Sequence, residues 1–380
     1  MKRNLLKFAT ICLASSLALT SCDKDNDNDV DINTLKSEVL ENTAKNVIEF
    51  SYSEMLAKVN TFKTSIADLV ASPTDAKLTT ARNNWKEVRA VWEKTEAWLF
   101  GAVATEDIDP RIDTWPVDFN EIDQLLASST VLDAAYFTRL DQALESSDED
   151  IVDAANAMRG FHPIEYILWG EDGTKTAAKL ATETRAKQYL VALVDNLQNL
   201  TKEVYESWSN GYSNQVAKAG NGSTEFATQK GAFIEIVEAM AGICGEVGEG
   251  KMGEPFNNQD PALEESPFSK NSMADFTNNI EGIMNIYQGK FGSRDGKGLE
   301  DFVQYYNKSL DLEIKAKHTA AINALKAITN PFGTALLASN SQSTLVQNAI
   351  NRINELAEVL NDGTDGNGKD LKDFILQYSN

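Results

Sequence analysis

The sequence predicts an all-α fold made of two helical-bundle domains. Apolar residues recur at helical spacing through most of the chain, whereas short alternating runs of β-branched residues are scarce. The roughly 350 residues that follow the N-terminal leader exceed what one hydrophobic core comfortably supports. We therefore expect an N-terminal domain over residues 33–215 and a C-terminal domain over residues 216–380. Their comparable helical content is compatible with an old duplication.

The N-terminal leader predicts export and lipid anchoring. A basic start precedes an apolar run over residues 8–19 that is too short to span a membrane, and Leu19-Thr20-Ser21-Cys22 follows it. We interpret residues 1–21 as a lipoprotein signal peptide, Cys22 as the acylated residue and residues 22–32 as an acidic flexible tether. The mature protein is then expected at the cell envelope, on the periplasmic face of the outer membrane or on the cell surface.

Charge and cysteine content restrict the function further. The formal net charge is −22, and it becomes −25 when the three basic residues of the leader are lost. Such acidity argues against nucleic-acid binding and is compatible with attraction of cations. After loss of Cys12 and acylation of Cys22, Cys244 has no cysteine partner within the chain, so stability must come from packing. We expect a monomer.

Helix signals place the elements. In the first half we expect helices over residues 31–71, 75–100, 118–127, 131–144, 148–162 and 177–209, with a polar, proline-broken loop over 101–117. In the second half we expect helices over residues 225–248, 271–289, 299–328, 342–361 and 368–378. The glycine-rich spans 245–253 and 292–298 and the proline-containing span 254–268 are predicted as loops.

The most distinctive segment runs from Arg159 to Gly170. His162 and Glu165 are three residues apart, close to one helical turn, so both can face the same neighbours, and Arg159 falls on the same stripe. Proline disfavours α geometry at the residue before it and favours the first helical position, so we expect a break at residues 160–162 and a new helix from Pro163. The polar triplet is either a satisfied buried network or a site.

The histidine count limits the metal chemistry. A zinc-protease helix needs two histidines four residues apart, but the only other histidine, His318, lies among lysines on a predicted solvated helix face. A metal site would therefore combine one histidine with oxygen ligands, which favours iron, manganese or calcium over zinc.

Three further segments carry acids. Glu93 and Glu96 are spaced to share a helix face below Arg89, Asp113 precedes Trp115-Pro116, and Glu265 lies in Glu265-Ser-Pro-Phe-Ser269. Structural interpretations exist for each, namely a solvated helix with an Arg89–Glu93 pair, a capping turn and a helix start. A serine-hydrolase elbow, a phosphate loop and a dinucleotide fingerprint are absent from the sequence.

Together the four segments resemble the imelysin-like family. The resemblance rests on Gly160-Phe-His162-Pro-Ile-Glu165, which matches the family's GxHxxE motif, and on Trp92-Glu-Lys-Thr95-Glu96 followed by Phe100-Gly101. It also rests on Ile112-Asp113-Thr-Trp115-Pro116, and on Glu265-Ser-Pro-Phe-Ser269 ahead of Asp275-Phe276 and Asn279-Ile280-Glu281-Gly282. It spans residues 35–375 in the family's motif order. It implies an exported, often lipid-anchored, two-domain helical protein associated with iron uptake, in a family that is also filed as metallopeptidase family M75.

The resemblance also implies a site. Metal ligands would come from His162, Glu165, Glu96, Asp113 and Glu93, and the residues lining the site would be Arg159, Arg89, Trp115, Glu265, Ser266 and Ser269. Iron is the expected metal, with zinc and calcium as alternatives. The expected ligand is a metal ion or an iron chelate, and the expected partner is an iron- or haem-transport membrane protein.

Two alternatives stay open at this point. One is a metallopeptidase with Glu165 as general base on a metal-bound water, which the single usable histidine disfavours. The other is a binding module without catalysis, in which the motif is a buried structural network.

Overall fold

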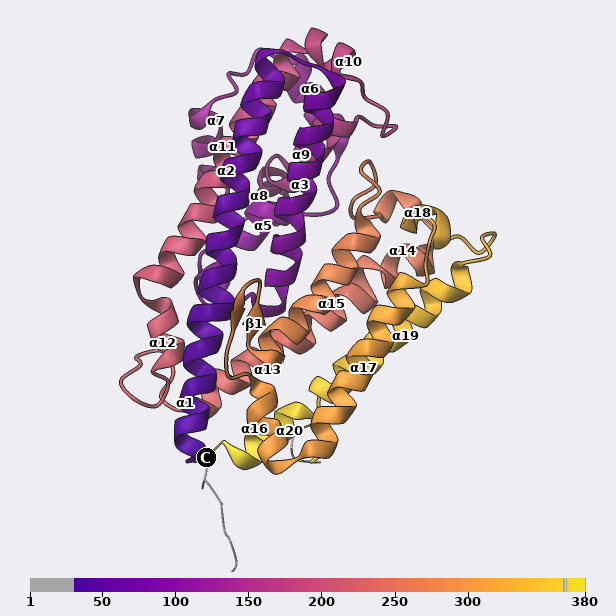
Figure 1. Ribbon diagram of the computed structural model, residues 1–380. Coiled ribbons are helices and arrows are strands. Elements are labelled where there is room, and N and C mark those ends of the chain that lie inside the picture. The colour runs from indigo at the N-terminus through magenta and orange to yellow at the C-terminus, as the bar shows by residue number, and fades with distance from the viewer. Residues whose placement is uncertain (1–30, 365, 367, 380) are drawn as a thin grey trace, which may run out of the picture. The chain divides into compact units, whose positions relative to one another are not determined.

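The computed structural model describes residues 31–364, 366 and 368–379 (Figure 1). The predicted signal peptide, the acylation site Cys22 and all but the end of the predicted tether lie outside the described residues. Among the described residues, no helix is both long and apolar enough to cross a bilayer.

The first half of the described chain is helical. Its helices are α1 (Ile32–Asn42), η1 (Thr43–Glu49), α2 (Phe50–Ala71), α3 (Asp75–Thr95), η2 (Glu96–Trp98), α4 (Ala102–Thr105), α5 (Ile108–Asp113), α6 (Phe119–Ala127), α7 (Ala134–Ala143), α8 (Glu149–Ala157), α9 (Phe161–Trp169), α10 (Ala177–Thr182), α11 (Thr184–Ser207), η3 (Trp208–Tyr212) and α12 (Ser213–Ala217). Helices α2, α3 and α11 form the main packed group here, with α2 contacting both α3 and α11 (Figure 1).

The second half is also helical apart from one hairpin. It contains α13 (Gln229–Gly245), η4 (Glu246–Lys251), α14 (Gly253–Asn258), η5 (Pro261–Leu263), α15 (Ser272–Gln288), β1 (Lys290–Phe291), β2 (Arg294–Asp295), α16 (Leu299–Tyr306), α17 (Lys308–Lys326), α18 (Phe332–Ala335), α19 (Ser343–Leu360) and α20 (Leu371–Tyr378). Helix α19 packs against α13 and α17. The all-α prediction is confirmed, while the domain division at residues 215–216 and the old duplication remain predictions.

Three predicted loops contain helices. The segment 101–117 contains α4 and α5, because residues such as Val103, Ile108 and Ile112 are fully buried and provide an apolar face that short helices need. The glycine-rich segment 245–253 continues α13 as the π-helix η4 and enters α14. In these two segments burial against neighbouring helices outweighs local sequence propensity. The third segment, 254–268, contains most of α14 and all of η5; Pro255 and Pro261 lie in the first turns of these helices, where proline is tolerated.

Two predicted long helices are instead interrupted. The expected helix over 177–209 breaks at Glu183, and the expected helix over 299–328 breaks at Asn307, which caps α17 by accepting a hydrogen bond from the Leu310 backbone. Asparagine is a preferred N-cap because its side chain satisfies an otherwise free N–H.

Helix α3 positions the candidate site. Thr74 caps its N-terminus by accepting from the Lys77 backbone N–H. The helix packs against α2 and also against α15 of the second half. Its buried residues include Trp85, Arg89, Trp92 and Glu93, so polar side chains enter the interior beside the large aromatic ones.

Candidate metal centre

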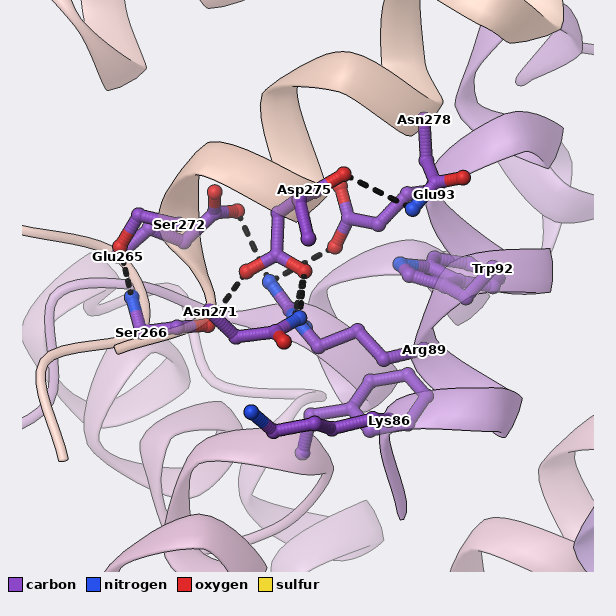
Figure 2. Close-up of polar contacts among 12 residues, drawn as sticks. Lys86, Arg89, Trp92, Glu93, Glu265, Ser266, Asn271, Ser272, Asp275 and Asn278 are labelled. Carbon is purple, nitrogen blue, oxygen red and sulfur yellow. Dashed lines mark hydrogen bonds and ion pairs between the residues drawn. The ribbon is translucent and has the colours of Figure 1, made fainter. Parts of the chain in front are cut away.

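Arg89 is the centre of a buried ion network. Its Nη2 lies 2.8 Å from Glu93 Oε1 and 3.1 Å from Glu265 Oε1. Its Nη1 lies 2.5 Å from Asp113 Oδ1, and its Nε lies 3.3 Å from Asp275 Oδ1. Figure 2 shows the Arg89 side chain reaching from α3 toward Asp275 on α15. Burial lowers the pKa of Arg89, but these four carboxylates outweigh burial and raise it.

Asp113, at the end of α5, is fixed by three side chains. Besides Arg89, its Oδ2 accepts a 2.7 Å hydrogen bond from Trp92 Nε1, and its Oδ1 lies 3.1 Å from His162 Nε2. Burial alone would raise the pKa of Asp113, but Arg89 and His162 hold it below its usual range. Asp113 is therefore an ionised carboxylate with a defined orientation.

Gly160 explains why α5 and α9 can approach. Gly160 has a φ of 80°, in the region that favours glycine. A Cβ at this position would lie 2.0 Å from the carbonyl oxygen of Ile112. The missing side chain lets the start of α9 rest on the end of α5, which brings His162 beside Asp113. The expected break at residues 160–162 is present, but α9 begins at Phe161, two residues before Pro163.

His162 and Glu165 continue the network inward. His162 Nδ1 lies 3.8 Å from Glu165 Oε2, and Glu165 Oε1 accepts a 2.7 Å hydrogen bond from the Ser269 backbone N–H. The His162 ring also lies 4.9 Å from the Trp115 ring. Burial lowers the pKa of His162, but the contacts with Asp113 and Glu165 outweigh it and raise the pKa to about 9. Both ring nitrogens thus face carboxylates.

Glu93, Glu96 and Asp113 form the candidate ligand group. Each offers a carboxylate oxygen, and these oxygens lie within 4.8 Å of one another. The Asn279 amide donates to Glu93 Oε2 at 2.8 Å and to Glu96 Oε2. Burial raises the pKa of Glu93 and raises that of Glu96 well above its usual value, and Glu93 raises the Glu96 pKa further. A bound cation would relieve this repulsion.

A cavity of about 240 Å³ opens beside these carboxylates. Its lining residues are Glu96, Asp109, Asp113, Trp115, Pro116, Glu246, Gly250, Lys251, Glu254, Pro255, Leu263 and Glu265. Six of these carry carboxyl groups and one carries an amine, so the cavity favours cations. Burial and then Asp113 raise the pKa of Asp109 to about 7.

Lys251, the last residue of η4, inserts an ammonium group among the acids. Its Nζ lies 2.9 Å from Glu265 Oε1, 3.0 Å from Glu96 Oε2 and 3.3 Å from Glu246 Oε1. A fourth carboxylate oxygen, Glu93 Oε2, is 3.7 Å away. Burial lowers the Lys251 pKa, but these acids outweigh it and raise the pKa well above its ordinary value.

The structure brings most of the sequence-predicted residues together. Glu265 links Arg89 to Lys251 and faces the cavity, and its buried Oε2 has no hydrogen-bond partner among the described residues. Ser266 Oγ donates to Asp275 Oδ2 at 2.6 Å, and Ser269 reaches Glu165 through its backbone. Ser266 and Ser269 therefore help to orient Asp275 and Glu165 by donating hydrogen bonds to them.

Arg159 lies apart from this group. Its Nη1 pairs with Asp141 Oδ1 at 2.6 Å, and its Nε donates to the Ala155 carbonyl. Glu165 is fully buried, and the described residues that line the cavity include Glu96 and Asp113 but not Glu165. His318, predicted on a solvated face, is instead half-buried, with Nε2 3.0 Å from the Ile280 carbonyl oxygen.

Sequence reasoning missed several members of the site. These are Asp109, Glu246, Lys251, Asp275 and Asn279. Lys251 and Glu246 lie in the glycine-rich segment 245–253, and Asp109 lies in the segment 101–117; both segments were predicted as loops. Asp275 and Asn279 are four residues apart on α15, a spacing that places them on one face of the helix. This spacing was the sequence signal that could have identified them as site residues.

Comparisons with known proteins identify the family and the fold. The family model described as Imelysin (Peptidase_M75) matches residues 48–360. The iron-regulated protein A of Synechococcus elongatus is 25% identical over 334 residues, which cover 85% of this chain and 85% of that protein. A crystal structure described as an iron-regulated protein A precursor from Parabacteroides distasonis superimposes with a TM-score of 0.75 at 24% identity, covering 86% of this chain and 93% of that one. An imelysin-like protein from Psychrobacter arcticum 273-4 superimposes with a TM-score of 0.60 at 10% identity, covering 87% and 94%. The chain belongs to the imelysin family.

Proposed function

We propose that this protein binds an iron ion through Glu93, Glu96 and Asp113 and serves iron acquisition at the cell envelope. The observation that carries the proposal is the convergence of three carboxylates, from the end of α3, η2 and α5, whose oxygens lie within 4.8 Å of one another beside an acidic cavity. The name of the Synechococcus relative, iron-regulated protein A, supports a role related to iron.

The donor set suits a hard cation. Carboxylate oxygens are ligands for iron, manganese, magnesium and calcium, whereas zinc sites usually draw on histidine or cysteine. Glu265 supports the same site, since its buried Oε2 lacks a hydrogen-bond partner among the described residues while the side chain lines the cavity. It is a candidate for an additional ligand.

His162 is proposed as the residue that orients Asp113. Its Nε2 faces Asp113 Oδ1, and its other ring nitrogen faces Glu165. In metal sites, partners of the ligating groups fix their orientation and strongly affect affinity. On this basis His162 and Glu165 of the GxHxxE motif orient the ligand Asp113 and do not themselves line the cavity.

The proposed activity is binding of a metal ion and not hydrolysis of peptides. A general base has to reach the metal-bound water within hydrogen-bond distance. Glu165 instead directs Oε1 to the Ser269 backbone and Oε2 toward His162. We further propose that Cys22 carries a lipid anchor. In this role the protein delivers the metal to an iron- or haem-transport membrane protein.

Calorimetric titration tests the proposal. The purified protein is titrated with Fe²⁺ under anaerobic conditions, and with Mn²⁺, Zn²⁺ and Ca²⁺. Glu96→Gln should weaken Fe²⁺ binding by roughly tenfold or more. Glu87→Gln is the matched control, because Glu87 lies on α3 but is exposed and paired with Lys58. Absence of binding by the wild type, or equal binding by Glu96→Gln, would overturn the proposal.

A further inference from the structure

Lys251 occupies the centre of the acidic group beside the cavity. Its Nζ contacts Glu96 through both carboxylate oxygens, at 3.0 and 3.2 Å, and Glu265 Oε1 at 2.9 Å. The side chain is only 11% exposed, and its four acidic neighbours come from α3, η2, η4 and the segment before α15. An ammonium in this environment already provides a cation for the carboxylates.

A metal ion would require the same oxygens. Two of the four acids that Lys251 contacts, Glu93 and Glu96, belong to the proposed ligand group. Carboxylate oxygens bind hard metal ions at about 2.0–2.6 Å, so a metal ion on Glu93 and Glu96 would lie close to the ammonium that now contacts the same carboxylates. Two neighbouring cations would also repel one another in a partly desolvated cavity.

We propose that Lys251 is a tethered competitor that sets the affinity and selectivity of the metal site. A cation gains access to Glu93 and Glu96 only by displacing the Lys251 ammonium. Because Na⁺ and K⁺ carry the same charge as the ammonium, they gain little by replacing it, whereas divalent and trivalent ions gain more. The inference rests on the proposed metal-binding function and adds the residue that controls it.

The local structure gives Lys251 a position to withdraw to. Glu246 lies 3.3 Å from Nζ, and its side chain is 47% exposed, so Lys251 can keep this ion pair while it leaves the two inner acids. Glu246 and Lys251 are the two ends of the π-helix η4. Such π-helical segments occur mostly as local irregularities in α-helices, frequently at functional sites.

Gly250 adds space beside Lys251. It lines the cavity, and a Cβ built on it would meet no atom within 4 Å. The residue that precedes Lys251 in η4 therefore borders open space.

The first arm of the test measures affinity. Mn²⁺, which avoids iron oxidation, is titrated into wild type, Lys251→Met and the control Lys202→Met. Lys202 is exposed on α11 and pairs only with Glu206 among the described residues. Lys251→Met should bind Mn²⁺ roughly tenfold more tightly or better, and Lys202→Met should match the wild type. Equal or weaker binding by Lys251→Met would overturn the inference.

The second arm does not depend on a variant that folds. The wild type is treated with an amine-acylating reagent, with and without saturating Mn²⁺, and acylation of Lys251 and Lys202 is followed by peptide mass spectrometry. Displacement should accelerate acylation of Lys251 roughly threefold or more and leave Lys202 unchanged. KCl at the same ionic strength should have no effect. If the protein binds Mn²⁺ but acylation of Lys251 is unchanged or slower, the inference about Lys251 is overturned and the proposed metal-binding function stands.

The two proposals fail in different ways. If neither wild type nor Lys251→Met binds any of the tested metals, the metal-binding function is wrong, and the inference falls with it. If the wild type and Lys251→Met bind Mn²⁺ equally, the metal-binding function stands and the competitor role alone is wrong.

Discussion

His162 Nε2 lies 3.1 Å from Asp113 Oδ1, which joins the GxHxxE motif on α9 to the acidic group at the end of α5. Asp113 also contacts Arg89 and Trp92, so three side chains fix one carboxylate. Binding of a metal ion through Asp113 depends on this arrangement. His162 itself is not one of the described residues that line the cavity.

Replacement of His162 should weaken metal binding without removing it. His162→Asn removes the contact at Nε2 and leaves Glu93, Glu96 and Asp113 in place. Loss of such a supporting partner typically costs a factor of about 10–100 in metal affinity. Calorimetry with Mn²⁺ measures the effect, and His318→Gln is the control. An unchanged dissociation constant for folded His162→Asn would argue against the orienting role.

Arg89→Met should strongly destabilise the fold. The substitution leaves Glu93, Asp113, Glu265 and Asp275 buried without their shared cation. Breaking a buried ion pair by removal of one partner usually costs about 3–5 kcal/mol. Urea unfolding followed by circular dichroism measures the loss.

The control for Arg89 is Arg352→Met. Arg352 is 42% exposed and pairs with Glu355 on the surface, so its loss should change stability by less than about 1 kcal/mol. Similar unfolding midpoints for the two variants would contradict the central place of Arg89.

Gly160→Ala should cost more stability than Gly222→Ala. Both glycines have positive φ, 80° and 96°, so both substitutions introduce backbone strain of about 1–3 kcal/mol. Only at Gly160 would the new Cβ collide with a backbone carbonyl, that of Ile112, whereas nothing lies within 4 Å at Gly222. Thermal unfolding of the two variants compares them, and equal losses would contradict the close approach of α5 and α9.

His318 should make stability fall with acidification. Burial lowers its pKa, partly opposed by the Ile280 carbonyl and by Glu281, while Lys326 lowers it further. In the unfolded chain a histidine titrates near pH 6.5, so below that pH the unfolded state binds more protons than the folded state. The free energy of unfolding contributed by His318 is therefore present above pH 6.5 and is lost as pH falls through the lower, folded-state pKa.

The variant His318→Gln isolates this contribution. Chemical unfolding at several pH values between 7.5 and 5 gives the stability difference between wild type and variant, in which the other titrating groups largely cancel. That difference should shift in favour of His318→Gln as the pH falls. A difference that stays constant would show that His318 does not titrate differently on folding.

The sequence predicted the helices with strong apolar periodicity and clear caps. Thr74 caps α3, Asp148 caps α8, and the break at Gly160 lies where the glycine-proline pattern indicated. The segments around residues 108 and 248 could not be assigned, because their helical state depends on burial against other helices. Local composition contains no information on that burial.

The site was only partly predictable for a similar reason. The resemblance to the imelysin-like family indicated Glu93, Glu96, Asp113 and His162, because each lies in a short motif of that family. Lys251 could not be placed near Glu96, since 155 residues separate them and the packing of α13 against η2 brings η4 to the site. The same holds for Asn279, whose amide reaches Glu93 from α15.

Anomalous diffraction from crystals soaked in Fe²⁺ tests the central claim most directly. The account predicts an iron peak in contact with the carboxylates of Glu93, Glu96 and Asp113, with Lys251 displaced from Glu96. A peak bound elsewhere, or none at an iron concentration that saturates binding in solution, would contradict it.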